Sequence, residues 1–265
     1  MATQLMFYAS AVPLSSQRHI GLSVKVGGDF GFARKANSVP LTAVEIPRAA
    51  ADYVVVFAGQ GDGIMPVVIL GIEPEHNLFI KENGAWDGVY VPAFVRRYPF
   101  VFAGSADAKT FTLCIDESFS GCNRDGRGEQ LFDTDGERTQ YLDTVLNFVK
   151  DYQVQHQRTS ALCKHLSDLG LLEPMQAQFT LPGGARRGLT GFMAVNRTKL
   201  KALDRETLTN LVVSDELELI YLHLQSLQNF NRMLQRIGAE PSTVPAAEGD
   251  EPAAHEEGDG APVTH

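Results

Sequence analysis

The segment from Trp86 to Phe100 gathers the side chains of this chain that are best suited to binding. It reads WDGVYVPAFVRRYPF and holds the only tryptophan, followed by Tyr90, Arg96 and Arg97. Tryptophan, tyrosine and arginine dominate the energetics of binding surfaces, and a guanidinium presents a planar fork that fits a carboxylate. We therefore expect these four side chains to line a recognition surface for a protein or peptide. The alternative is that the aromatic rings belong to the core and the arginines are solvated.

The same segment predicts an edge strand. VYVPAFV is apolar and β-branched, and Pro92 cannot donate to a sheet ladder, which confines such a strand to an edge or a bulge. An edge strand can accept an extended peptide by main-chain pairing. Alternation along the strand would point Arg96 and Arg97 to opposite faces, so one of them would meet the partner while the other supports the fold.

A second group of residues would suit an enzyme. His19, Asp116 and Arg97 are scattered along the chain, yet a pocket between sheet and helices would bring an imidazole, a carboxylate and a guanidinium together. Asp116 and Glu117 are adjacent, so on a strand they face opposite sides and cannot act as one carboxylate pair. These residues define an enzymatic alternative without indicating a reaction.

The motifs of common chemistries are missing. The sequence has no phosphate-binding Gly-x-x-x-x-Gly-Lys loop, no Gly-x-Ser-x-Gly elbow, and no Cys-x-x-Cys or His-x-x-x-His pair. Cys114 and Cys122 have no histidine nearby, which favours buried thiols over a zinc site. We therefore expect neither a metal ion nor a cofactor.

The charge of the chain is concentrated at its end. The formal net charge is −9, and residues 240–265 contain seven acidic residues with no lysine or arginine, which leaves about −2 for residues 1–239. A nearly neutral body argues against nucleic-acid binding, which requires a basic face. The tail is rich in Pro, Ala, Glu and Gly, so we expect it to be disordered.

The composition predicts a soluble protein. The 265 residues are 44% hydrophobic, as expected for a globular chain with a full core, and no apolar run approaches the roughly 18 residues of a membrane span. An export signal would require a basic residue near the start of the chain, but no Lys or Arg precedes Arg18. The three cysteines make no disulfide framework. These features favour the cytoplasm and argue against membrane insertion.

The elements that position these residues begin with a β-rich part, residues 1–130. Two stretches within it, ADYVVVFAGQGDGIMPVVILGIE and RRYPFVFAGSADAKTFTLCIDE, align Tyr53 with Tyr98 and Phe57 with Phe102. In each, an apolar run ends at Phe-Ala-Gly, a polar turn follows, and a second apolar run begins, which predicts a β-hairpin. We interpret them as a duplicated hairpin within one antiparallel sheet or barrel-like region, the alternative being two hairpins that converged on similar residues.

A helix-rich part, residues 131–239, follows. From Arg138, apolar residues recur every three or four positions over about 30 residues, which predicts a long helix with Thr134 or Asp135 as its cap and Gly170 as its end. A hairpin is expected around the Pro-Gly-Gly at 182–184, then a short helix, a helix capped by Asp204, and a long helix over 216–237. The whole predicts a single α+β domain over residues 1–239, with the acidic tail outside it.

Several segments together resemble the SapC family of bacterial proteins. They are YVPAFVRRYPFVFAG, LCIDES, the stretch from LFDTDGERTQ to LSDLGLLEP, GLTGFMAVNRTKLKAL and ELELIYLHLQSLQNFNRML, and they cover residues from about 5 to 237. The resemblance implies a link to surface-layer genes, from which the family takes its name, and neighbours that resemble flavin-dependent halogenases, cupins and outer-membrane receptors. It implies no particular reaction. A peptide-transport permease that shares the name is a different, membrane-spanning protein.

Three functions are consistent with these observations. The first is a soluble, non-catalytic binding or accessory protein that recognises a protein or peptide linked to surface-layer or envelope systems. The second is an enzyme built on scattered His, Asp and Arg residues, acting with a halogenase-like or cupin-like partner. The third is a structural component of a surface layer, which the lack of an export signal disfavours. The residue types of the 86–100 segment favour the first.

Overall fold

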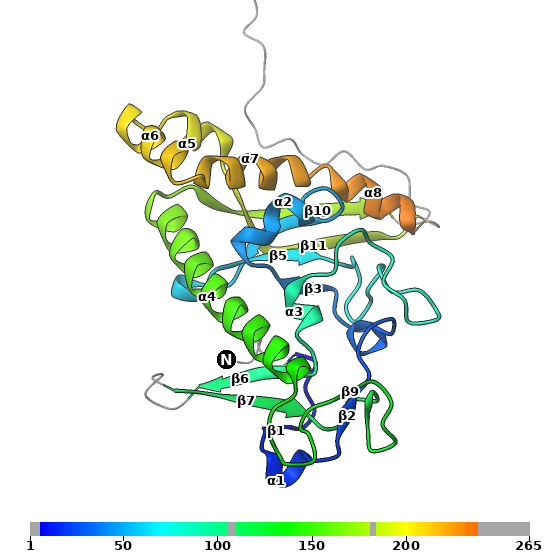
Figure 1. The fold of residues 1–265 in the computed structure, drawn as a ribbon. Helices are drawn as coiled ribbons and strands as arrows, with labels where there is room; N and C mark the ends of the chain where they lie inside the picture. Colours follow the sequence, from blue (N-terminus) through cyan, green and yellow to red (C-terminus); the bar gives the residue numbers. More distant parts are fainter. Residues whose placement is uncertain (1–5, 105–109, 181–183, 238–265) are drawn as a thin grey trace, which may run out of the picture.

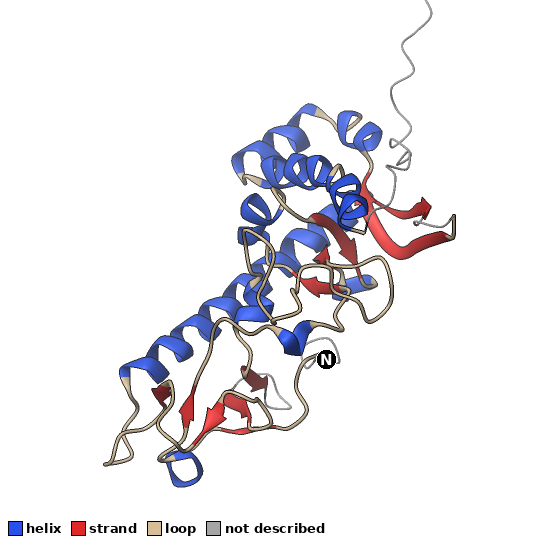
Figure 2. Cartoon of the chain, turned by 90° about the vertical axis from the view of Figure 1, so that its right-hand side faces the viewer, coloured by secondary structure: helices blue, strands red, loops and turns tan. Residues whose placement is uncertain are grey.

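The chain has an α+β fold with antiparallel sheets, seen in a computed structural model that describes residues 6–104, 110–180 and 184–237. The fold class predicted from the sequence is therefore confirmed. One end of the molecule holds a larger sheet under several helices, the other end holds smaller sheets, and α4 (Gln140–Asp168) runs between the two ends (Figure 1). Figure 2, turned by 90°, shows the same lengthwise course of this helix. The acidic tail lies outside the described residues.

The larger sheet has five strands in the order β10-β11-β4-β5-β3. It joins strands of the N-terminal part to a later hairpin, which was expected around residues 182–184 and is confirmed, although residues 181–183 themselves lie outside the described part. The sheet therefore unites the β-rich and helix-rich parts of the sequence. Its strands are β3 (Ser38–Pro40), β4 (Val54–Ala58), β5 (Met65–Ile69), β10 (Leu172–Thr180) and β11 (Arg186–Val195).

A row of helices covers this sheet (Figure 1). Phe230, which belongs to one of these helices, is fully buried, with its ring 5.5 Å from that of Phe179 and 6.2 Å from that of Phe192 in the sheet. Asp204 caps α6 by accepting a 2.9 Å hydrogen bond from the Thr207 amide, as predicted. The helices are α5 (Arg197–Lys201), α6 (Arg205–Val213), α7 (Glu216–Ser226) and α8 (Asn229–Arg236).

The single helix expected over residues 216–237 is wrong, because α7 ends at Ser226 and α8 begins at Asn229. Side chains at the break form hydrogen bonds with the backbone of β4 and of the residues that lead into it, instead of facing solvent. The Ser226 hydroxyl accepts from the Val55 amide at 3.0 Å, and the Asn229 amide donates to the carbonyls of Ala50 and Tyr53, each at 2.8 Å. The break thus supplies partners to backbone groups that the sheet leaves unpaired.

His223 of α7 connects two strands of the larger sheet. β4 and β11 pair where Phe57 faces Met193, and Val55 and Val195 lie opposite each other two residues further along in this register. The imidazole instead bridges them: Nδ1 lies 2.8 Å from the Val55 carbonyl oxygen, and Nε2 accepts from the Val195 amide at 3.1 Å. These partners require a neutral ring, and burial lowers the pKa of His223 to about 4.

The opposite end of the molecule contains two three-stranded sheets, ordered β1-β7-β6 and β8-β2-β9. The first half of α4 packs on them through Leu142 and Val149, which are buried against Phe100 and Ile115. The elements are β1 (Ala11–Pro13), α1 (Ser16–His19), β2 (Ser23–Val24), β6 (Phe100–Gly104), β7 (Phe111–Asp116), β8 (Cys122–Asn123) and β9 (Glu129–Gln130).

Both stretches of the proposed duplication form hairpins, β4-β5 and β6-β7, in which Phe57 faces Pro66 and Phe102 faces Leu113. The expectation that they share one sheet is wrong, because β4-β5 belongs to the five-stranded sheet and β6-β7 to a three-stranded one. Both outer edges of β4-β5 are already paired, with β11 and with β3. No edge of that hairpin is left for the second one to join.

The edge strand expected at VYVPAFV is also wrong, because the segment turns into α3 (Ala93–Arg96) with Pro92 at its N-cap. The Pro92 carbonyl accepts hydrogen bonds from the amides of Val95 and Arg96 at 2.9 and 3.0 Å. A proline here loses nothing, since the first residues of a helix have no intrahelical acceptor for their amides. Main-chain pairing of a peptide with a strand at this position therefore has no basis.

The long helix α4 has 29 residues and ends before Gly170, close to its predicted limits. Its cap is Thr139, whose hydroxyl accepts from the Leu142 amide at 3.3 Å, rather than Thr134 or Asp135. No helix in the described ranges is long and apolar enough to cross a membrane. The residues buried along α4 are Leu142, Val149, Tyr152, Thr159, Leu162, Cys163 and Leu166.

Short turns of 3-10 helix and a short α-helix, α2, complete the described part of the fold. η3 and α2 follow each other directly and lead from β3 toward β4. They matter for the site because η3 also contacts α4, where the Ala43 amide donates to the Thr159 hydroxyl at 2.8 Å. These elements are η2 (Gly31–Ala33), η3 (Ala43–Glu45), α2 (Ile46–Ala49) and η4 (Gly61–Gly63).

Candidate functional site

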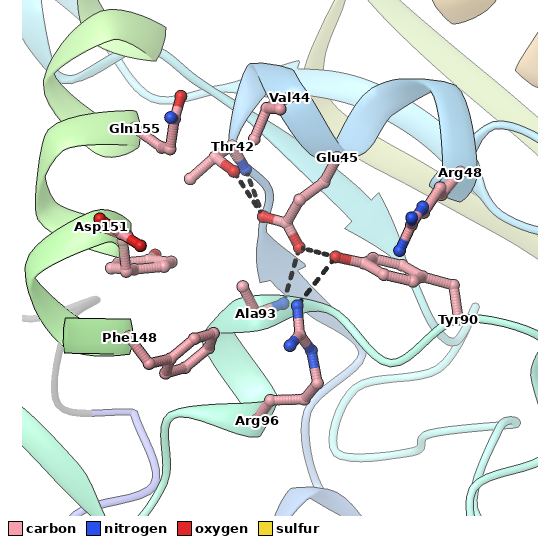
Figure 3. A pocket seen from close by; sticks show the side chains of 11 residues that line it. Thr42, Val44, Glu45, Arg48, Tyr90, Ala93, Arg96, Phe148, Asp151 and Gln155 are labelled. Carbon is pink, nitrogen blue, oxygen red and sulfur yellow. Dashed lines mark hydrogen bonds between the residues drawn. The ribbon is translucent and has the colours of Figure 1, made fainter. Parts of the chain in front are cut away.

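A pocket of about 360 Å³ opens where η3 and α2, the segment leading into α3, and the middle of α4 converge (Figure 3). It lies between the two ends of the molecule, so its walls come from segments far apart in the sequence. Its lining residues are Thr42, Val44, Glu45, Arg48, Tyr90, Ala93, Arg96, Phe148, Asp151, Tyr152 and Gln155.

Glu45 holds the walls of this pocket together. One carboxylate oxygen, Oε2, accepts from the amide and the hydroxyl of Thr42, at 2.9 and 2.7 Å. The other, Oε1, accepts from the Tyr90 hydroxyl at 2.8 Å and from the Ala93 amide at 2.6 Å. A carboxylate offers about four acceptor positions, and here four donors occupy them. Glu45, which is 4% exposed, is therefore a structural anchor of the pocket.

Arg96 is held in a defined orientation at the pocket. Its Nε donates to the Val91 carbonyl at 2.9 Å and one terminal nitrogen, Nη2, donates to the Tyr90 hydroxyl at 3.1 Å. The guanidinium carbon also lies 5.1 Å from the centre of the Phe148 ring and 5.6 Å from that of Tyr90, within the range of cation–π attraction. The other terminal nitrogen, Nη1, forms no hydrogen bond with any residue in the described part of the chain.

Tyr90 couples Arg96 to Glu45. Its hydroxyl accepts from Arg96 and donates to the Glu45 carboxylate, so the three side chains form one hydrogen-bonded chain. Burial, together with the adjacent Glu45 carboxylate, raises the pKa of Tyr90 to about 12. The phenol therefore stays protonated and keeps donating at neutral pH.

The remaining polar residues of the pocket come from opposite walls. Arg48, on α2, is exposed and forms neither a hydrogen bond nor an ion pair with any residue that the structure describes. Asp151 and Gln155 face the pocket from α4, across from Tyr90 and the arginines (Figure 3). The pocket thus has a guanidinium side and a side that carries carboxylate and amide groups, with aromatic rings between them.

Two of the four residues expected in the 86–100 segment, Tyr90 and Arg96, line this pocket. Trp86 is half-buried elsewhere, where its Nε1 donates to the Tyr53 hydroxyl at 2.8 Å and its ring packs 5.7 Å from that of Phe30. Arg97 is 3% exposed, with its guanidinium 4.4 Å from the Phe94 ring centre and 4.7 Å from that of Tyr152. The turn of α3 thus sends one arginine to the surface and the next into the core.

His19 and Asp116 are fully buried at the other end of the molecule, and neither lines the pocket. The His19 Nδ1 lies 3.0 Å from the Ser15 carbonyl oxygen, and Nε2 lies 3.2 Å from Oε1 of Glu117. Burial by itself would raise the pKa of Asp116, but hydrogen bonds from Ser118, Ala9 and Ser10 bring it below its ordinary value. Asp116 thereby ties the N-terminal segment to β7, with the Ala9 amide 2.7 Å away.

The other nine lining residues were not anticipated from the sequence as site residues, and among them are Glu45, Arg48, Phe148 and Asp151. One local signal existed, because Thr42 and Glu45 form a capping box of the S/T-x-x-E type, which marks a helix start. That pattern does not indicate a site. Within the described residues, no group of three or more His, Cys, Asp or Glu side chains is placed to hold a metal ion.

Comparison with known proteins gives one match. The model of the SapC family matches residues 14–233, a range that contains every residue of the pocket. No curated protein and no solved structure matches the chain. The chemistry of the pocket therefore has to be argued from its own residues.

Proposed function

The chain belongs to the SapC family, and on this premise we propose that it is a non-catalytic binding protein that recognises a protein or peptide through the pocket around Arg96. The pocket is lined by Tyr90 and Phe148, whose rings offer large and fairly rigid contact area. Arg96 adds a donor of fixed direction. These are the residue types that dominate protein recognition.

The observation that carries the proposal is the hydrogen-bonded chain from Arg96 through Tyr90 to Glu45. It orients Arg96 before any ligand arrives, which reduces the entropy lost on binding. It also uses up the groups that acid–base chemistry would need. Glu45 has its oxygens occupied by donors, and the pKa of Tyr90, near 12, keeps the phenol from acting as a base.

The enzymatic alternative built on His19, Asp116 and Arg97 has less support. Each of these side chains is buried among its own contacts, and none lines the pocket. The link to surface-layer or envelope systems, and an accessory role within them, are part of the proposal and are supported by family membership alone. A cytoplasmic location is proposed on the sequence alone.

The test is an affinity capture from the lysate of the source bacterium, quantified by mass spectrometry. The bait proteins are the wild type, Arg96→Gln and Phe148→Ala, with Arg158→Gln as the matched control. Arg158 is an exposed arginine of the same helix as Phe148 and does not line the pocket. Thermal melts establish beforehand that every variant folds.

We expect a specific partner that the wild type and Arg158→Gln retain and that both pocket variants lose. A partner captured equally by all four proteins would show that recognition occurs on another surface, and the proposal would be wrong.

A further inference from the structure

We propose that the ligand group recognised in this pocket is a carboxylate, held by Arg48 and Arg96, on a peptide that also places an apolar side chain against Phe148. This inference rests on the proposed function and names the chemistry of the same site. It follows from the hydrogen bonds and charges of the lining residues.

Two guanidinium groups line this pocket, and both have N–H donors that no described residue accepts from. Arg48 has no hydrogen-bond or ion-pair partner within the described residues, and Nη1 of Arg96 has none either. Glu45, an acid of the same pocket, accepts hydrogen bonds from Thr42, Tyr90 and Ala93 and does not bond to either arginine. An anion from outside is the natural complement to such a pair, because charge-assisted bonds to guanidinium are among the strongest hydrogen bonds.

The charges that line the pocket favour an anion with a single negative charge. Glu45 and Asp151 also line the pocket, so its two positive groups are balanced by two negative ones. A dianionic phosphate would meet more repulsion from these acids than a carboxylate, which carries a single charge. The planar fork of a guanidinium also matches the two oxygens of a carboxylate.

The walls of the pocket on α4 indicate what the rest of the ligand is. Phe148 and Tyr152 provide an apolar wall on α4, and Asp151 and Gln155 add acceptors beyond it. A peptide suits this arrangement, since its amide N–H groups can donate to those acceptors while its carboxylate faces the arginines. The carboxylate has two sources in a peptide, an acidic side chain or the chain terminus, and the probes below separate them.

Tyr90 and Glu45 are positioning residues, which act by orienting Arg96. Tyr90→Phe keeps the ring and the positive charge but removes the hydroxyl that accepts from Arg96. We expect this variant to bind the carboxylate more weakly and to change the Arg96 Nε–H resonance in NMR spectra of the unliganded protein. A purely structural role for the hydroxyl would not weaken acid binding selectively over amide binding.

The experiment is an NMR titration of the full chain with three capped dipeptides. Acetyl-Phe-Glu-amide carries the side-chain carboxylate, acetyl-Gln-Phe carries a free terminal carboxylate, and acetyl-Phe-Gln-amide is neutral. The signals followed are the Arg96 Nε–H and the backbone amides of residues 42–48, 90–96 and 148–155, which surround the pocket. A fourth probe, acetyl-Phe-phosphoserine-amide, tests the dianion.

We expect saturable shifts at these signals with at least one acidic dipeptide, and binding of the neutral dipeptide weaker by about tenfold, as for loss of one charged hydrogen-bond partner. Arg48→Gln and Arg96→Gln should each reduce this selectivity for acid over amide, while Arg158→Gln leaves it unchanged. The acidic dipeptide that binds more tightly identifies the source of the carboxylate. Equal binding of the two acidic dipeptides supports recognition of a carboxylate from either source.

Several results would overturn the inference: equal binding of the neutral dipeptide, tighter binding of the phosphorylated one, selectivity that survives both arginine substitutions, or no shift at the pocket up to about 10 mM of any acidic probe. The capture experiment fails or succeeds independently of these outcomes. A partner lost in Arg96→Gln together with no acid selectivity leaves the proposed function standing and rejects the carboxylate. Acid selectivity without a pocket-dependent partner supports the carboxylate site and rejects the protein partner.

Discussion

Replacing His223 by Gln should remove a pH dependence of stability that the wild-type protein shows between about pH 4 and 6.5. The imidazole is fully buried between two strands, where its Nε2 must stay unprotonated to accept from the Val195 amide. A proton on Nε2 would oppose that amide and leave a charge in the core. Glutamine is of similar length and does not titrate.

The direction and the magnitude follow from the lowered pKa. In the unfolded chain His223 titrates near 6.5, whereas in the folded protein burial lowers its pKa to about 4. Between these values the unfolded chain binds more protons, so stability is fully present above pH 6.5 and is lost as the pH falls to about 4. At 1.36 kcal/mol per unit of pKa, the loss is about 3 kcal/mol in the free energy of unfolding.

The assay is urea unfolding at several pH values from 7 to 4, for the wild type, His223→Gln and His76→Gln. His76 is exposed, so its substitution controls for the removal of a histidine. Other titrating groups contribute equally to wild type and variant and cancel in the difference. The stability advantage of the wild type over His223→Gln should shrink by about 3 kcal/mol from pH 7 to pH 4. A difference that stays constant across this range, or an equal change in His76→Gln, would refute the reasoning.

Three further predictions concern the anchor, the long helix and the tail. Glu45→Ala should lower the free energy of unfolding by about 2–4 kcal/mol in urea titrations, because buried donors of Tyr90 and Ala93 lose their acceptor; an unchanged midpoint would exclude an anchoring role. Leu166→Ala should lower the free energy of unfolding by about 2–5 kcal/mol in the same measurement, since Leu166 is 1% exposed, whereas Leu146→Ala should lower it less because Leu146 is half-buried. Equal losses in the two variants would mean that burial does not determine the loss of stability. Truncation after Gly238 should leave the melting temperature within about 2 °C of that of the full chain, and a larger fall would show that the tail packs on the body.

The candidate site was only partly accessible to reasoning from the sequence. Tyr90 and Arg96 could be found because their types and proximity are typical of binding surfaces. Trp86 has the same character, yet it packs against Phe30 and bonds to Tyr53 outside the pocket. Residue type therefore identified candidates, and packing decided which of them face the cavity.

Glu45 shows why the rest of the site could not be found. It lies 45 positions from Tyr90 and 48 from Ala93 in the chain, and its hydrogen bonds to both depend on how η3 and α3 meet. Phe148 and Asp151 join the pocket from α4, a third segment. No pattern within a few residues of Glu45 encodes contacts at such separations.

The elements that the sequence determined by itself are those governed by neighbouring residues. The apolar period of three or four marks α4 and Gly170 ends it, while Asp204 caps α6 by bonding three residues ahead. The two hairpins of the duplication and the later hairpin at β10-β11 likewise follow from local alternation and turns. In each case the stabilising contacts lie within one element or between adjacent ones.

Only the tertiary structure decided how these elements combine. The two similar hairpins enter different sheets because β11 and β3 already occupy both edges of the first. Pro92 begins a helix instead of an edge strand. His223 enters the ladder between β4 and β11 from a helix, although it lies 168 residues away from Val55 in the chain. The physical reason is the same throughout: edge pairing, burial and bridging bonds depend on partners distant in sequence, and local propensity yields to whichever arrangement satisfies the buried groups.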